Sequence, residues 1–112
     1  MKKILPLFLF IALTACSAKL LLPTQTDVNR VSAKYPGYTW NELMAGKSIY
    51  EQNWRILKDP ASRNEEQWKE IVPHLVKKLN KRKGKEVIDS KAQETLLKYL
   101  ITMSMVPKNT SR

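Results

Sequence analysis

Cysteine and histidine are the residues best suited to covalent and metal chemistry, and this chain of 112 residues has one of each, Cys16 and His74. A lone cysteine excludes an intrachain disulfide framework and any zinc or iron–sulfur site that needs several thiolates. It also excludes a Cys-x-x-Cys-His haem attachment motif, which needs two thiols. No metal site is therefore expected. No pairing of a nucleophile with a base is visible either, so we do not expect an enzyme.

The residues before Cys16 have the parts of a secretory signal peptide. Residues 1–3 are cationic, residues 4–13 form an apolar run broken only by Pro6, and Ala15 is a small residue at the exit. The run is too short for a permanent transmembrane helix, which takes about 20 apolar residues. Leu13-Thr14-Ala15-Cys16 resembles the lipobox of bacterial lipoproteins, whose cysteine receives a diacylglyceryl group and becomes the acylated N-terminus after cleavage. The alternatives are an ordinary signal peptide with a chance cysteine, or a small buried thiol.

This pattern predicts how the N-terminal part is organised. Residues 1–15 are the expected signal peptide, and Cys16 is the expected lipidation site. Residues 16–38 are the expected lipidated N-terminus and tether, with residues 17–34 mostly extended and mobile. The expected location is the bacterial cell envelope, with membrane lipid as the partner of Cys16. Ser17 follows the cysteine, which resembles lipoproteins passed on to an outer membrane.

The chain is strongly basic, with a formal charge of +10 that falls by two, to +8, when Lys2 and Lys3 leave with the signal peptide. A cluster of six cations follows the middle of the chain: Lys77, Lys78, Lys81, Arg82, Lys83 and Lys85. One interpretation is electrostatic contact with an acidic protein or an anionic surface. The other is a solvated helix end, where lysine suits the dipole. No motif that reads nucleic acid is present, and no nucleic-acid partner is expected.

The cationic cluster and His74 belong to a predicted small all-α domain. The apolar spacing places this domain at residues 39–106, followed by a tail at 107–112. A capping box at Thr39 predicts a first helix over about residues 40–56. Asn64 is the predicted cap of a second helix, whose apolar stripe ends at Leu79 and in which Pro73 predicts a kink or two shorter pieces. Residues 80–86 are expected to form a basic loop.

A third helix is predicted from a capping box at Ser90 to about Ser104. Gly46 in the first helix is informative, because a helical glycine costs roughly 1 kcal/mol against alanine and so needs a reason. A close crossing by the last helix, with Tyr99 and Leu100 on its face, would supply that reason.

Several segments resemble small cytochrome c domains of bacteria, namely the lipoprotein-like monohaem proteins of the Bacteroidetes type. Residues 35–39, Leu43 and residues 45–53 resemble the start of that family's domain. Residues 65–73 resemble its mid-domain helix, and residues 95–102 resemble its C-terminal helix. The resemblance covers roughly residues 35–103 and implies a three-helix cytochrome c-like domain.

The chain departs from this family where the haem chemistry would be. The family's asparagine equivalent to Asn53 precedes Cys-x-x-Cys-His, whereas here residues 54–60 read Trp-Arg-Ile-Leu-Lys-Asp-Pro. The family's methionine ligand shortly after the mid-domain proline is also missing, with Leu75 at that position. Covalent haem is thus excluded. His74 is the weak candidate for a haem ligand, because iron can be held by side chains alone.

We expect no cofactor and a binding or structural role, with Trp54, Ile56 and Leu57 folding inward to fill the volume of the missing haem. The alternative is an electron-transfer protein of the cytochrome c family that binds haem non-covalently. A small enzyme is a third hypothesis, which would require a cleft with perturbed titrating groups.

Overall fold

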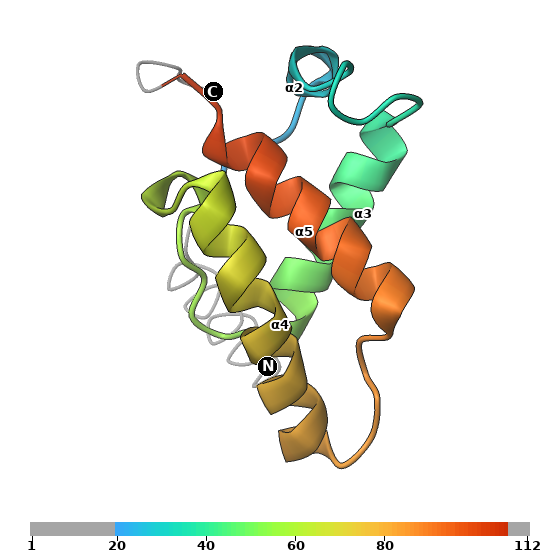
Figure 1. The fold of residues 1–112 in the computed structure, drawn as a ribbon, viewed down its shortest axis with the longest axis vertical. Coiled ribbons are helices and arrows are strands. Elements are labelled where there is room, and N and C mark those ends of the chain that lie inside the picture. The colour runs from blue at the N-terminus through green and yellow to red at the C-terminus, as the bar shows by residue number, and fades with distance from the viewer. Residues whose placement is uncertain (1–19, 108–112) are drawn as a thin grey trace, which may run out of the picture.

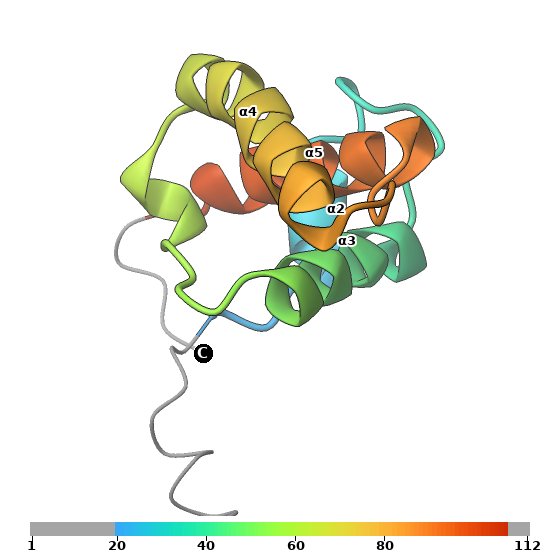
Figure 2. The ribbon, with the colours of Figure 1, turned by 90° about the horizontal axis from the view of Figure 1, so that it is seen from below.

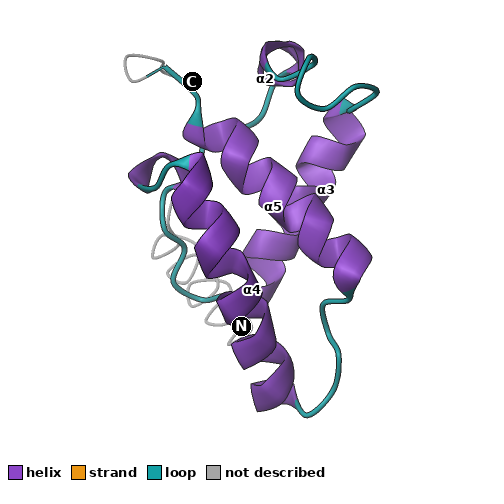
Figure 3. Cartoon of the chain, in the orientation of Figure 1, coloured by secondary structure: helices purple, strands orange, loops and turns teal. Residues whose placement is uncertain are grey.

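A computed structural model describes residues 20–107, which form four α-helices and one short 3-10 helix and hold no strand (Figure 1, Figure 3). The elements are α2 (Gln25–Arg30), α3 (Trp40–Asn53), η1 (Pro60–Ser62), α4 (Glu65–Lys83) and α5 (Ser90–Ser104). The predicted all-α class is therefore confirmed. The predicted signal peptide, Cys16 and residues 108–112 lie outside the described residues.

The starts of α3 and α4 follow the predicted caps. Thr39 Oγ1 accepts a hydrogen bond from the backbone N–H of Glu42 at 3.1 Å, and the Glu42 carboxylate accepts one from the N–H of Thr39 at 3.1 Å. Asn64 and Gln67 form the same reciprocal pair before α4, at 2.8 and 2.9 Å. Each box satisfies backbone donors that a helix start leaves without an intrahelical partner.

The capping box predicted at Ser90 is wrong by one residue. The cap of α5 is Asp89, whose carboxylate accepts a hydrogen bond from the N–H of Ala92 at 2.8 Å. An aspartate caps as well as a serine, so the earlier residue takes the role and Ser90 becomes the first residue of the helix.

Two predicted helix ends are also corrected. α3 stops at Asn53, before the expected end at 56, because Trp54 adopts an extended backbone with φ −132° and ψ 138°. α4 runs unbroken through Pro73, which lies on its exposed side, where water can bond the carbonyl that proline leaves free. It then continues to Lys83, so most of the predicted basic loop over residues 80–86 is helix.

Gly84 and Asn80 explain where α4 ends. Gly84 has φ +73°, the left-handed conformation that commonly stops a helix, and its N–H bonds the last carbonyls. The side-chain oxygen of Asn80 accepts hydrogen bonds from the N–H groups of Val87 and Ile88 at 2.8 and 3.0 Å. Its amide donates to the carbonyl of Ile88 at 3.1 Å, so one helical side chain holds the following loop.

The helix α5 is the centre of the fold and lies between α3 and α4 (Figure 2). Its side chains Leu96, Tyr99 and Leu100 are fully buried. Both neighbouring helices turn their apolar stripes toward it, which removes the largest side chains from water. The fully buried partners from α3 and α4 are Leu43, Trp68, Val72 and Leu79.

The crossing of α3 and α5 occurs at Gly46, as predicted. A Cβ atom added at Gly46 would come within 2.6 Å of the carbonyl oxygen of Thr95, and closer still to the Cβ of Tyr99. Neither obstacle is the end of a flexible side chain, so only glycine lets the two backbones approach this closely.

The N-terminal part of the domain was predicted wrongly. Residues 17–34 were expected to be extended, but α2 forms over Gln25–Arg30, and Val28 and Val31 are buried in the core. A capping box of Thr24 and Asp27 starts this helix, with the N–H of Thr24 donating to Asp27 Oδ2 at 2.8 Å. The helical domain therefore includes residues 25–30 and does not start at residue 39.

Candidate functional site

The predicted lipidation site, Cys16, lies outside the described residues. Within residues 20–107, no helix combines the length and the apolar character needed to cross a membrane.

The segment at which the resemblance to cytochrome c domains would place the haem motif follows α3 directly. The Trp54 ring is half-buried and lies tilted on the ring of Tyr50, with centroids 6.1 Å apart, and Leu57 packs against the core. Ile56 does not fold inward: its side chain is 83% exposed. The backbone bends at residues 55–56, which turns both side chains toward solvent. The prediction for Ile56 is therefore wrong.

Aromatic side chains from the helices close this segment onto the core. The Tyr50 hydroxyl accepts from the N–H of Lys58 at 2.8 Å and donates to its carbonyl at 2.9 Å. The indole of Trp68, fully buried, donates to the carbonyl of Pro60 at 2.8 Å. These bonds satisfy backbone groups that the irregular segment would otherwise leave unpaired.

Neither of the two cavities described here combines the volume for a haem with a side chain that holds haem iron. The cavity lined by Tyr99, Met103 and neighbours measures about 10 Å³, room for one water molecule. His74 is exposed on α4 and lines neither this cavity nor the larger groove described below. That groove is lined by no histidine, methionine, cysteine or tyrosine, which are the side chains that hold haem iron.

An open groove of about 760 Å³ lies between the C-terminal ends of α3 and α4. Trp54 and the exposed Ile56 give it apolar walls, while Arg55 joins two members of the cationic cluster, Arg82 and Lys83. The remaining lining residues are polar or acidic: Glu51, Gln52 and Asn53. The charge and apolar surface of the groove suit a partner that carries both negative charge and an apolar side chain.

The structure places all six predicted cations on the surface. Five of them belong to the last two turns of α4, and Lys85 follows Gly84. Four are spaced so that they share one side of the helix: Lys77, Lys78, Lys81 and Arg82. Like charges four residues apart destabilise a helix by a few tenths of a kcal/mol per pair, offset in part by the dipole.

These six cations differ from several other lysines of the domain, which form ion pairs with carboxylates. Lys34 bonds Glu65 at 2.8 Å and Lys69 bonds it at 3.1 Å, and the Lys34 hydrogen bond holds the pKa of Glu65 below its usual value. Lys47 and Lys98 also have carboxylate partners, Glu51 and Glu94. None of the six cations takes part in an ion pair between described residues.

Sequence reasoning missed Arg55 and Asn80. Arg55 is distant in sequence from the cluster and reaches it only because α3 ends early and the chain bends. Asn80 was placed in a loop, although its hydrogen bonds fix the position of the segment that carries Lys85. Capping and apolar spacing carry no signal for either residue, because Arg55 acts through a contact distant in sequence and Asn80 through the loop that follows its own helix.

Among the described residues, no group of three or more histidine, cysteine, aspartate or glutamate side chains could hold a metal ion. The strongest pKa shifts belong to tyrosines. Burial raises the pKa of Tyr35 to about 12, with a smaller effect of Glu65, and burial also raises the pKa of Tyr38, Tyr50 and Tyr99. None of these tyrosines lines the groove.

In comparisons with known proteins, no family model, curated protein or solved structure matches this chain.

Proposed function

We propose that this chain is a lipid-anchored protein of the bacterial cell envelope, in which a cytochrome c-like helical domain without haem binds an acidic protein. The anchor is Cys16, and the docking site is the cationic end of α4 together with the groove beside it. The proposed role is binding, without catalysis or electron transfer.

The cytochrome-like part of the proposal is supported by the order of the helices. The three segments that resemble the family form α3, α4 and α5 in that order. The place of the haem motif is taken by a segment that Tyr50 and Trp68 hold with hydrogen bonds. The cavity beside Tyr99 measures about 10 Å³, which supports a core completed by side chains rather than by a prosthetic group.

The observation that carries the binding proposal is the stripe of cations without acidic partners. Four of them repel one another along one side of α4, and no carboxylate within residues 20–107 forms an ion pair with them. The stripe leads to a groove in which Arg55, Arg82 and Lys83 surround Trp54 and Ile56. An acidic segment with an apolar side chain would satisfy both features.

The binding proposal is tested by titrating the protein into a fluorescein-labelled peptide of glutamate and leucine residues and measuring anisotropy. The double variant Arg82→Glu, Lys83→Glu should bind about tenfold more weakly, since each surface pair contributes up to about 1 kcal/mol. Binding should also weaken with added salt. The control is Lys91→Glu, an exposed lysine at the start of α5. Equal losses in both variants would refute a specific site.

The anchor is tested by metabolic labelling with an alkyne fatty acid. Wild-type protein should be labelled and should sediment with the membrane, whereas Cys16→Ser should be unlabelled. Labelling that persists in Cys16→Ser would refute this site.

The absence of haem is tested by the absorption spectrum of protein produced with added haem. We expect no Soret band, because the groove offers no side chain for the iron. A Soret band lost in His74→Ala would instead favour non-covalent haem and electron transfer.

A further inference from the structure

The outer side of α3 differs in character from the rest of the surface. Over residues 40–48 its exposed residues carry no formal charge, and they follow helical spacing along one side: Trp40, Asn41, Ala45 and Ser48. Leu22, 57% exposed, precedes the buried Pro23, whose carbonyl accepts a hydrogen bond from the Trp40 indole at 3.0 Å. Leu22 therefore lies beside Trp40, and together these residues form what we call the α3 face. The nearest charged residues of α3 are Glu42, which caps the helix, and the ion pair of Lys47 with Glu51.

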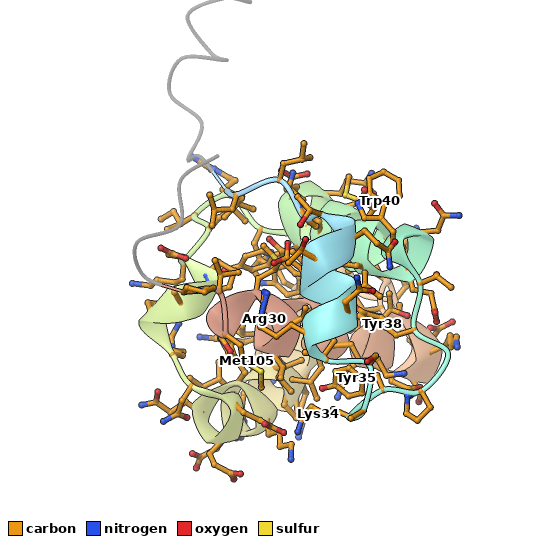
Figure 4. The ribbon with its side chains drawn as sticks, turned by 90° about the horizontal axis from the view of Figure 1, so that it is seen from above. Arg30, Lys34, Tyr35, Tyr38, Trp40 and Met105 are labelled. Atoms are coloured by element: carbon orange, nitrogen blue, oxygen red, sulfur yellow. The ribbon has the colours of Figure 1, made fainter. Side chains whose placement is uncertain are left out.

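The first described residues are fixed at this face. Leu20 and Leu21 pack against the core, and the Trp40 hydrogen bond holds Pro23. Figure 4 shows Trp40 at the edge of the molecule, beside the start of α2. Four peptide units separate Cys16 from Leu20, and they can span at most about 14 Å. A lipid on Cys16 would therefore hold the bilayer close to Leu22 and Trp40.

The cationic cluster lies on another part of the molecule. α3 and α4 lie on opposite sides of α5 (Figure 2). α4 begins just after η1, whose Pro60 shares a small cavity with Leu21, and its 19 residues then run for about 28 Å to Lys83. The attached end of the chain and the cations are therefore separated by about the length of α4.

We propose that the α3 face rests on the surface of the bilayer that holds the Cys16 lipid, and that the cationic end of α4 points away from that bilayer. The inference rests on the proposed anchor at Cys16. Trp40 and Leu22 enter the interfacial region, where tryptophan is favoured and apolar side chains leave water. The uncharged residues of the α3 face can approach the bilayer surface as well, because no charge has to be desolvated. The groove remains open to an acidic protein.

The test places a nitroxide at one of two exposed positions in the lipidated full-length protein, Ser48→Cys on α3 or Lys78→Cys on α4. The thioether at Cys16 leaves the introduced cysteine as the only free thiol. The protein is reconstituted into vesicles of phosphatidylethanolamine and phosphatidylglycerol. Accessibility to a water-soluble nickel complex is then compared with accessibility to oxygen, which concentrates in lipid.

We expect the label at position 48 to be several-fold less accessible to nickel than the label at position 78, and more accessible to oxygen. Leu22→Ser should lower the equilibrium constant for resting on the bilayer about tenfold, and so expose position 48. Ile56→Ser, a matched change at an exposed apolar residue in the groove, should leave position 48 shielded. Circular dichroism checks that both variants are folded.

Equal nickel accessibility at positions 48 and 78 in membrane-bound protein would overturn the inference and leave the anchor intact. Spin–spin broadening at position 48 would overturn it too, because a second copy of the chain would then cover the α3 face. Protein that fails to stay with the vesicles would refute the anchor itself, and the inference would fall with it.

Discussion

The two helices on either side of α5 have similar inner faces and opposite outer ones. α3 meets α5 at Gly46, and α4 buries Trp68 and its other apolar side chains in the same core. Outside, the exposed residues of α3 over positions 40–48 are uncharged, whereas the C-terminal end of α4 carries cations that form no ion pair among the described residues. Folding requires only the inner faces, so the difference between the outer faces is a guide to what each side contacts. We assign the neutral side to lipid and the cationic side to an acidic protein.

The largest effect should come from alkaline pH, which acts on the α3 side. All four tyrosines of the chain lie before α3, in α3 or in α5, and none is in α4. Burial raises the pKa of Tyr35 to about 12, above the ordinary value of about 10. The neutral tyrosine therefore stabilises the fold fully below pH 10, and this contribution is lost as the pH rises through about 12. Tyrosinate absorbance should rise together with loss of helical circular dichroism. A gradual tyrosinate titration centred near the ordinary value, with the helices intact, would contradict this.

The next largest effect should come from removing the largest buried side chain of α4, which is Trp68. Trp68→Ala should lower the free energy of unfolding by about 3–5 kcal/mol, since it leaves a cavity and an unpaired carbonyl at Pro60. Trp54→Ala is the matched change at a half-buried tryptophan and should cost less. Urea denaturation measures both. A larger loss for Trp54→Ala would show that Trp54 contributes more to the core than Trp68.

The contact between α3 and α5 is tested by Gly46→Ala. The added methyl group would meet Tyr99 and the Thr95 backbone, so the helices must separate, at a cost of about 1–3 kcal/mol. Ala45→Ser on the exposed side of the same helix is the control and should change stability by less than about 0.5 kcal/mol. Thermal unfolding measures the stability change in each of the two variants. An unchanged melting temperature for Gly46→Ala would mean that the helices do not cross this closely.

The smallest effect should come from the outer side of α4. Lys78→Glu removes repulsion with Lys81 and Arg82 and should stabilise the domain by a few tenths of a kcal/mol at low salt. Added salt should shrink this gain, because screening already weakens the repulsion in the wild type. A stability loss in Lys78→Glu would show that the cations contribute to the fold rather than to binding.

Local signals in the sequence predicted the parts of the fold that depend on local physics. The boxes at Thr39 and Asn64 work through side chains three residues away, and Gly46 stands out because a helical glycine is costly. The all-α class follows from apolar spacing, which the packing around α5 confirms.

The errors occur where distant contacts decide the structure. α2 has only six residues, and Val28 and Val31 are buried among side chains distant in sequence. The last turn of α4 depends on Gly84 and on the bonds from Asn80 to the following loop. Ile56 faces solvent because the early end of α3 redirects the chain. The groove depends on all of these features, so the sequence alone predicted Arg82 and Lys83 but neither Arg55 nor the apolar walls.

The most direct test of the account is native mass spectrometry of the protein extracted from membranes in mild detergent. We predict a chain that begins at Cys16 and carries the mass of a diacylglyceryl group and an acyl chain, with no mass for haem. A chain that keeps residues 1–15, lacks the lipid, or carries haem would contradict the central claim of a lipid-anchored domain that folds without a cofactor.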